Sequence, residues 1–118
     1  MKPGAYIGAD PGMGGALALF ALGRPDFTPG DLDVTILVED MPALTIDDKR
    51  QLDHWKLAAI LGAWSSTHDI KDVAIERVHS MPEQGVASSF AFGSCFGAIK
   101  QAVASAGLRM TLIPPRSL

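Results

Sequence analysis

The apolar residues in the first part of the chain fall into three short runs that predict strands. Residues 5–10 and 14–20 are apolar with β character, and the Pro- and Gly-rich residues 11–14 between them predict a tight turn. We therefore expect the first two strands to form an antiparallel hairpin. Residues 34–38 form a third, continuously apolar run, which predicts a well-covered strand that ends at Met41-Pro42.

The pattern changes to a helical period over residues 52–65. One apolar stripe is formed by Leu52, Trp55, Ala59 and Ala63, and it is widened by Leu57, Ile60, Leu61 and Trp64. Asp53, His54 and Lys56 fall outside the stripe, so we expect them to face solvent. The pattern predicts an amphipathic helix.

Two further strands are expected in the second half of the chain. Residues 72–76 predict a fourth strand, and residues 109–113 predict a fifth, which two prolines stop. The order β-β-β-α-β-α-β predicts an α/β domain built on a mixed five-stranded sheet with flanking helices. In such a sheet the first and fourth strands would be parallel and adjacent, with their carboxyl ends at one edge.

A second helix is expected over roughly residues 87–106. Ser88 or Ser89 is available as its cap, and Gly107 as its terminator. Gly93 and Gly97, four positions apart, give this helix a stripe of small residues. The stripe favours close packing onto the sheet, with a helix–helix contact in a dimer as the alternative.

Asp10 and Glu76 each close one of the two strands that should be adjacent. An acid at the end of a buried strand faces a desolvation cost of several kcal/mol unless its charge is compensated. Neighbouring strands lie roughly 4.8 Å apart, so both side chains can reach one divalent cation. The pair predicts a metal site, although Asp10 before Pro-Gly is also a typical turn residue.

Composition describes one soluble domain. The chain has 118 residues, is 47% apolar and has no long low-complexity tract. Its single cysteine, Cys95, excludes an internal disulfide and fits a reducing compartment, so we expect the cytoplasm. The apolar residues 15–22 are too few for a membrane span and follow no basic segment, so we expect neither a signal peptide nor a membrane partner.

The formal net charge of −3 argues against a wholly basic nucleic-acid surface. The charge is unevenly spread, however. Residues 1–75 hold six of the ten Lys and Arg and eleven of the thirteen Asp and Glu. Residues 76–118 are therefore net positive, and the half of the chain that contains Glu76 stays compatible with a nucleic-acid partner.

Two blocks of the sequence resemble a known family. Residues 7–12 (IGADPG), followed by a glycine-led strand, resemble the opening of the ribonuclease H-like superfamily. Residues 74–93 (AIERVHSMPEQGVASSFAFG) resemble the RuvC-type Holliday junction resolvases, particularly the phage-like branch. The resemblance spans nearly all of the chain. Sugar kinases and actin-like ATPases share the first block, whereas the two blocks in this order are more specific.

The resemblance implies a metal-dependent endodeoxyribonuclease that hydrolyses phosphodiester bonds in four-way or branched DNA, in recombination and repair. It implies that Asp10 and Glu76 are catalytic ligands in a two-metal site for Mg²⁺ or Mn²⁺, and that the protein is a homodimer. The candidate nucleic-acid-binding residues are Gly12, Gly14, Arg77, His79, Ser88, Phe90, Lys100 and Arg116.

Several of these residues also have ordinary structural roles. Gly12 and Gly14 favour a tight turn over a close phosphate contact. Strand alternation points Arg77 away from Glu76, which favours a surface ion pair. His79 stands where many resolvases place a base-stacking aromatic, but a solvated loop histidine is the simpler interpretation.

Aromatic and basic residues of the second helix are open to two interpretations as well. Phe90, Phe92 and Phe96 are expected mainly in the core, with Phe90 as a candidate wedge between DNA bases. Lys100 and Arg116 are candidate phosphate contacts, although single exposed cations are usually only solvated.

One departure from the family pattern concerns the remaining acids. The family takes further metal ligands from a helix after the fifth strand, whereas no acid follows Glu83 here. We expect either that residues 1–118 form a C-terminally incomplete single domain or that the protein is a catalytically deficient relative. Two rival functions stay open: a nucleic-acid-binding module without chemistry, and an actin-like or sugar-kinase ATPase half.

Overall fold

A computed structural model describes residues 2–12, 14–22, 34–77 and 86–114, with side chains from residue 90 onward in the last range. The elements are β1 (Gly4–Asp10), β2 (Ala16–Leu22), β3 (Val34–Asp40), β4 (Ala43–Ile46), β5 (Lys49–Leu52), α1 (His54–Thr67), β6 (Asp69–Glu76), α2 (Val86–Ser105) and β7 (Met110–Ile113). In this part of the chain, no helix is long and apolar enough to cross a membrane.

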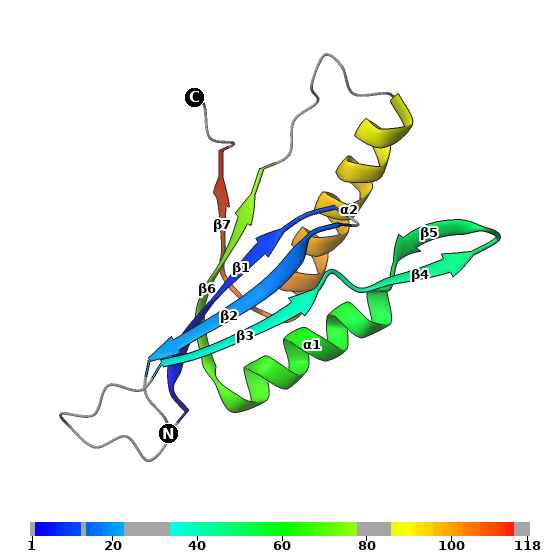
Figure 1. Ribbon diagram of the computed structural model, residues 1–118. Coiled ribbons are helices and arrows are strands. Elements are labelled where there is room, and N and C mark those ends of the chain that lie inside the picture. Colours follow the sequence, from blue (N-terminus) through cyan, green and yellow to red (C-terminus); the bar gives the residue numbers. More distant parts are fainter. Residues whose placement is uncertain (1, 13, 23–33, 78–85, 115–118) are drawn as a thin grey trace.

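Five strands form one mixed sheet in the order β3-β2-β1-β6-β7 (Figure 1). β1 pairs antiparallel with β2, so the predicted hairpin is confirmed, and β3 pairs antiparallel with β2 on its other side. β1 pairs parallel with β6, and β6 with β7, which α2 joins by a crossover. The expected α/β class and the adjacency of the two acid-bearing strands are therefore confirmed.

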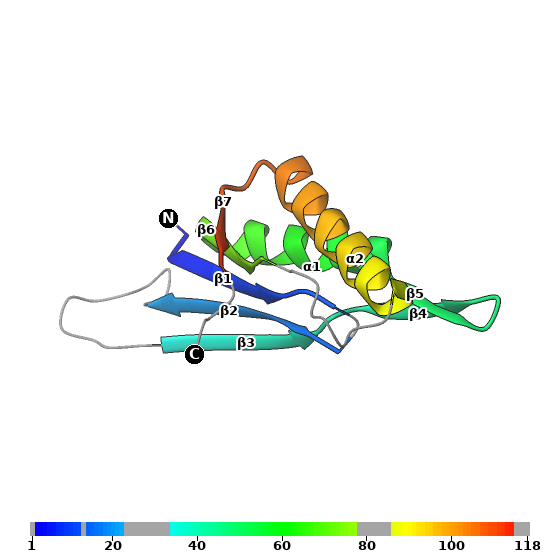
Figure 2. The same cartoon turned by 90° about the horizontal axis from the view of Figure 1, so that it is seen from above.

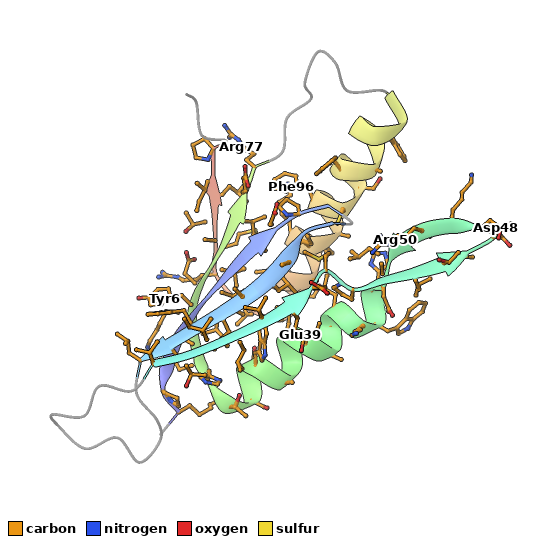
Figure 3. The ribbon with its side chains drawn as sticks, in the orientation of Figure 1. Tyr6, Glu39, Asp48, Arg50, Arg77 and Phe96 are labelled. Atoms are coloured by element: carbon orange, nitrogen blue, oxygen red, sulfur yellow. The ribbon has the colours of Figure 1, made fainter. Side chains whose placement is uncertain are left out.

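Both helices cover the same face of the sheet (Figure 2). Alternate strand residues point to this face and form the core with the helices: Ala5, Ile7, Ala9, Leu17, Leu19, Ala21, Val73 and Ile75. The opposite side, here called the open face, carries a cross-strand row of Tyr6, Phe20 and Ile36. Tyr6 is labelled in Figure 3. All three are exposed, since none of the described elements covers this face.

β3 is not well covered, contrary to the prediction. It is an outer strand of the sheet, and its large apolar side chains Val34, Ile36, Leu37 and Val38 are each at least 40% exposed. A continuous apolar run is typical of a strand that is buried on both faces. The run itself does not reveal where the strand stands in the sheet, and the outer position explains the error.

The buried side of α1 differs from the predicted stripe. It consists of the residues expected only to widen that stripe, namely Leu57, Ile60, Leu61 and Trp64, whereas Trp55 is 77% exposed and Ala59 and Ala63 are also exposed. The buried residues follow the i, i+3, i+4, i+7 spacing. They bury more apolar area than the alanines do, so the helix rotates to favour them.

Asp53 caps α1 and is not simply a solvent-facing residue. Its Oδ1 accepts a hydrogen bond from the backbone N–H of Lys56 at 3.0 Å, which satisfies one of the free N–H groups of the first turn. The preceding residue, Leu52, lies in β5 rather than in the helix. The helix therefore begins two residues later than predicted, at His54.

β4 and β5 form a separate hairpin that the sequence analysis did not predict. Its turn residues Asp47 and Asp48 have positive φ angles of 51° and 62°. Two-residue hairpin turns require this conformation and usually contain glycine or asparagine. Asp accepts it better than most residues, but the pair is a weak signal, which explains the omission. The hairpin projects from the body of the protein (Figure 1).

The start of α2 also differs from the prediction. The helix begins at Val86, so Ser88 and Ser89 lie inside it and are not caps. Its end agrees with the prediction: Gly107 has a positive φ of 74°, and the N–H of Leu108 donates to the carbonyl of Val103 at 3.1 Å. This is the usual glycine ending of a helix.

The glycine stripe of α2 does not pack onto the sheet. Gly93 and Gly97 are exposed, and a Cβ atom added to either one would meet no atom within 4 Å. The packing interpretation is therefore wrong. The alternative, a contact between helices of two protomers, stays a prediction.

Candidate metal centre

Asp10 and Glu76 end two adjacent parallel strands. The last registered pair between β1 and β6 is Ala9 with Ile75, and one carboxylate directly follows each of these residues. Ala9 and Ile75 are buried beneath the helices, so strand alternation directs Asp10 and Glu76 to the open face, where both are exposed. Neighbouring strands bring their backbones to roughly 4.8 Å, as expected from the sequence.

A tight turn follows Asp10 and depends on two glycines. Gly12 has a φ of 112°, and its carbonyl accepts a hydrogen bond from the N–H of Gly15 at 3.1 Å. A Cβ atom on Gly15 would clash with the backbone carbonyl of Asp10. Gly14 has open space around it and no positive φ. The turn interpretation is therefore supported at Gly12 and Gly15 but not at Gly14.

Helix α2 holds this turn in place. The N–H of Gly12 donates to the Sγ of Cys95 at 3.3 Å, and a Cβ atom on Gly12 would approach the Phe92 ring to 2.7 Å. Burial raises the pKa of the Cys95 thiol, with the hydrogen bond from Gly12 opposing this effect. In the sequence alone, Cys95 excludes an internal disulfide and indicates a reducing compartment, but no motif assigns it to the site.

The two carboxylates suit a hard divalent cation, which prefers oxygen ligands. They form only part of a metal site, however. In the part of the chain that the structure describes, no three His, Cys, Asp or Glu side chains are grouped to hold one ion. Asp40 lies in the same cross-strand row, but Ala16 separates it from Asp10. Two strand spacings, about 10 Å, place it too far away to share a directly bound ion.

Arg77 is a predicted site residue that lies beside Glu76. Arg77 follows Glu76 at the end of β6 and is exposed (Figure 3), and its backbone N–H donates to the carbonyl of Ile113 at 2.6 Å. The described residues form one ion pair, Lys71–Asp69, so the expected surface ion pair of Arg77 is not found among them.

The phenylalanines of α2 differ in exposure. Phe90 is 76% exposed and Phe92 is 38% exposed, so their placement in the core is wrong, whereas Phe96 packs partly against the core. The ammonium group of Lys100 lies 4.6 Å from the centre of the Phe96 ring, an attractive cation–π contact. His79, Arg116 and the side chain of Ser88 lie outside the described residues.

The sheet order, with two helices on one face, is that of a ribonuclease H-like fold. The fold is similar to that of RuvC. Thermus thermophilus RuvC in complex with a Holliday junction substrate matches with a TM-score of 0.58 at 17% sequence identity, and another structure of this RuvC matches with 0.55 at 21%. Each match covers 94% of this chain and 64% of the other, so the chain spans less than two thirds of their length. No protein-family model and no curated protein matches the sequence.

Proposed function

We propose that the chain is a metal-dependent endodeoxyribonuclease of the RuvC type that acts on four-way or branched DNA. One observation carries the proposal: Asp10 and Glu76 end adjacent parallel strands. The fold adds support, because its solved neighbours are RuvC structures, one of them with a Holliday junction substrate. We further propose a cytoplasmic homodimer, which suits the symmetry of a four-way junction.

In this proposal Asp10 and Glu76 hold Mg²⁺ or Mn²⁺ at the edge of the open face. A divalent cation held by these two carboxylates would supply a lower pKa of bound water and would neutralise charge on the leaving oxygen during phosphodiester hydrolysis. The chain itself contributes position. β1 and β6 set the spacing of the carboxylates, and the turn anchored on Cys95 holds Asp10 at the end of its strand.

The residues that contact DNA in this proposal are those that the described structure leaves accessible at this end of the sheet. Arg77 directly follows Glu76, Gly14 lies four positions after Asp10, and both are exposed. Gly12 is buried, so it is not among these contacts. Phe90 presents an accessible ring for a base. Lys100 is a weaker candidate, because its ammonium group already lies over Phe96. His79, Ser88 and Arg116 stay predictions.

Two carboxylates are fewer than a two-metal site needs, since each ion requires several oxygen ligands. We therefore expect the 118 residues alone to bind branched DNA and one cation but to cleave slowly. The rival interpretation, a binding module without chemistry, predicts DNA binding without any metal-dependent product.

The test compares cleavage of a labelled four-way junction with that of linear duplexes of the same sequences, in Mg²⁺, in Mn²⁺ and in EDTA. We expect a slow, junction-selective product that requires metal and is lost in Asp10→Asn and Glu76→Gln. Asp72→Asn is the matched control, because Asp72 lies on the same strand and face as Glu76 but pairs with Tyr6, far from the strand end.

Two results would contradict the proposal. Cleavage that survives both substitutions would remove Asp10 and Glu76 from the chemistry. Junction binding with no metal-dependent product under any condition would favour the binding module instead.

A further inference from the structure

A groove of about 890 Å³ lies between the β4–β5 hairpin and residues 90–98 of α2. Its volume falls in the range of sites that hold small organic ligands. The hairpin contributes Lys49, Arg50 and Gln51 to the lining, and His54 adds the first residue of α1. None of these four residues is a site candidate from the sequence alone.

The charged side chains that line the groove are basic. Its titratable lining residues are Lys49, Arg50, His54 and Cys95, and no Asp or Glu of the described chain lines it. This contrasts with the chain as a whole, in which acids outnumber Lys and Arg. The hairpin's acidic turn residue Asp48 lies at its far tip, whereas Arg50 lies nearer the body of the protein (Figure 3). The groove therefore favours an anionic ligand.

The opposite wall of the groove is mostly apolar, with Ser94 contributing a hydroxyl group. Phe90, Ala91 and Ala98 of α2 line it, and Phe90 leaves most of its ring accessible. Phosphates of a double helix require cations but no apolar wall. An aromatic ring beside paired cations is the combination that binds single strands, because bases stack on the ring while the cations follow the backbone.

The groove is also connected to the candidate metal centre. Cys95 lines the groove, and its Sγ accepts the hydrogen bond from Gly12 in the turn after Asp10. Cys95 therefore contacts both the groove and the turn that positions Asp10, a proposed metal ligand.

From these observations we propose that the groove binds a single strand of DNA, with Lys49 and Arg50 on phosphates and Phe90 stacked on a base. The proposal rests on the proposed nuclease function and deepens it. It assigns to the hairpin the task of holding an unpaired or distorted strand of the branched substrate.

The test measures binding of a fluorescent single-stranded oligonucleotide and of a four-way junction by anisotropy, in EDTA, over a series of KCl concentrations. We compare the double variant Lys49→Gln/Arg50→Gln with Lys2→Gln/Lys71→Gln. The control removes the same charge far from the groove, from Lys2 just before β1 and from Lys71 near the start of β6. Removing two phosphate contacts to a single strand should reduce the salt slope by about 1.4, and the control should leave it unchanged.

Phe90 is tested separately. Phe90→Leu should weaken single-strand binding about tenfold or more without changing the salt slope, whereas Phe90→Tyr should retain affinity, because stacking needs a flat ring. An oligonucleotide that carries 2-aminopurine should lose its fluorescence quenching in Phe90→Leu only. Thermal unfolding of each variant verifies that these exposed positions leave the fold intact.

Three outcomes would overturn the proposal. Equal salt slopes for the two double variants would exclude the hairpin cations. If duplex DNA binds more tightly than single-stranded DNA and Phe90→Leu leaves that affinity unchanged, the groove is a site for duplex phosphates. Sedimentation in which Phe90→Leu dissociates a dimer and leaves DNA affinity unchanged would assign the groove to a second copy of the chain. Failure of the nuclease proposal is distinguishable, because Asp10→Asn affects metal-dependent cleavage but not metal-free binding in the groove.

Discussion

The backbone N–H of Gly12 donates to the Sγ of Cys95 at 3.3 Å, although 83 positions separate the two residues in the sequence. The contact joins the turn after Asp10 to the middle of α2. It means that the position of one proposed metal ligand depends on how the second helix packs, and not only on the pairing of strands.

Substitution of Gly12 should destabilise the protein more than substitution of Gly14. In Gly12→Ala the side chain meets a φ of 112° and approaches the Phe92 ring to 2.7 Å, so we expect a loss of about 1–3 kcal/mol. Gly14→Ala is the matched control, since nothing lies within 4 Å of its added Cβ, and should change stability by less than about 0.5 kcal/mol. Urea unfolding measures both, and equal losses would contradict the described turn.

Cys95 should be unreactive in the folded protein and should make stability depend on alkaline pH. Burial raises the pKa of its thiol, so the folded state keeps a proton that the unfolded state releases above about pH 8.5. Stability from this group is therefore unchanged below that pH and falls as the pH rises above it. Unfolding curves from pH 7 to 10 should show this fall in the native chain and not in Cys95→Ala.

Thiol labelling gives an independent measurement of the same burial. Iodoacetamide should modify Cys95 slowly at pH 8 without denaturant and rapidly in urea. Rapid labelling of the folded protein would contradict the position of Cys95 beneath the turn.

The orientation of α1 can be tested with two substitutions in the same helix. Leu57→Ala removes a fully buried side chain and should cost about 2–5 kcal/mol. Trp55→Ala removes a larger side chain that is mostly exposed and should cost less than about 1 kcal/mol. The opposite order of losses would restore the stripe predicted from the sequence.

Removal of the α1 cap should have a smaller effect. Asp53→Ala deletes the acceptor for the N–H of Lys56 and should cost about 1 kcal/mol, whereas Asp53→Asn keeps an acceptor oxygen and should retain most of the stability. Thermal unfolding monitored by circular dichroism is sufficient to separate the two variants. A loss of similar size in both would point to the charge of Asp53 rather than its hydrogen bond.

Binding of a divalent cation should stabilise the folded chain through the two strand-end carboxylates. A ligand at 100 times its dissociation constant adds about 2.7 kcal/mol, so Mn²⁺ should raise Tm in the native protein. The increase should vanish in Asp10→Asn and persist in Asp72→Asn. The readout does not require cleavage, so it tests the metal site even where hydrolysis is slow.

Much of the sheet follows from local sequence. The apolar runs around the turn at residues 11–14 predict an antiparallel hairpin, because a glycine-rich turn and alternating strands are short-range features. The same holds for the two acids, since each directly ends a strand that its own sequence specifies. The helix ending at Gly107 is also local, because glycine accepts the positive φ there without steric cost.

Other features depend on contacts that no short segment contains. The exposure of β3 follows from its outer place in the strand order, and the buried side of α1 follows from the face that meets the sheet. The hairpin groove and the contact between Gly12 and Cys95 join segments far apart in the chain. The sequence by itself thus determined the five strands of the main sheet, the turn after Asp10 and the two acids, because these depend on local conformational preference. Only the tertiary structure decided which surfaces are buried and what surrounds the acids, because burial depends on packing between distant elements.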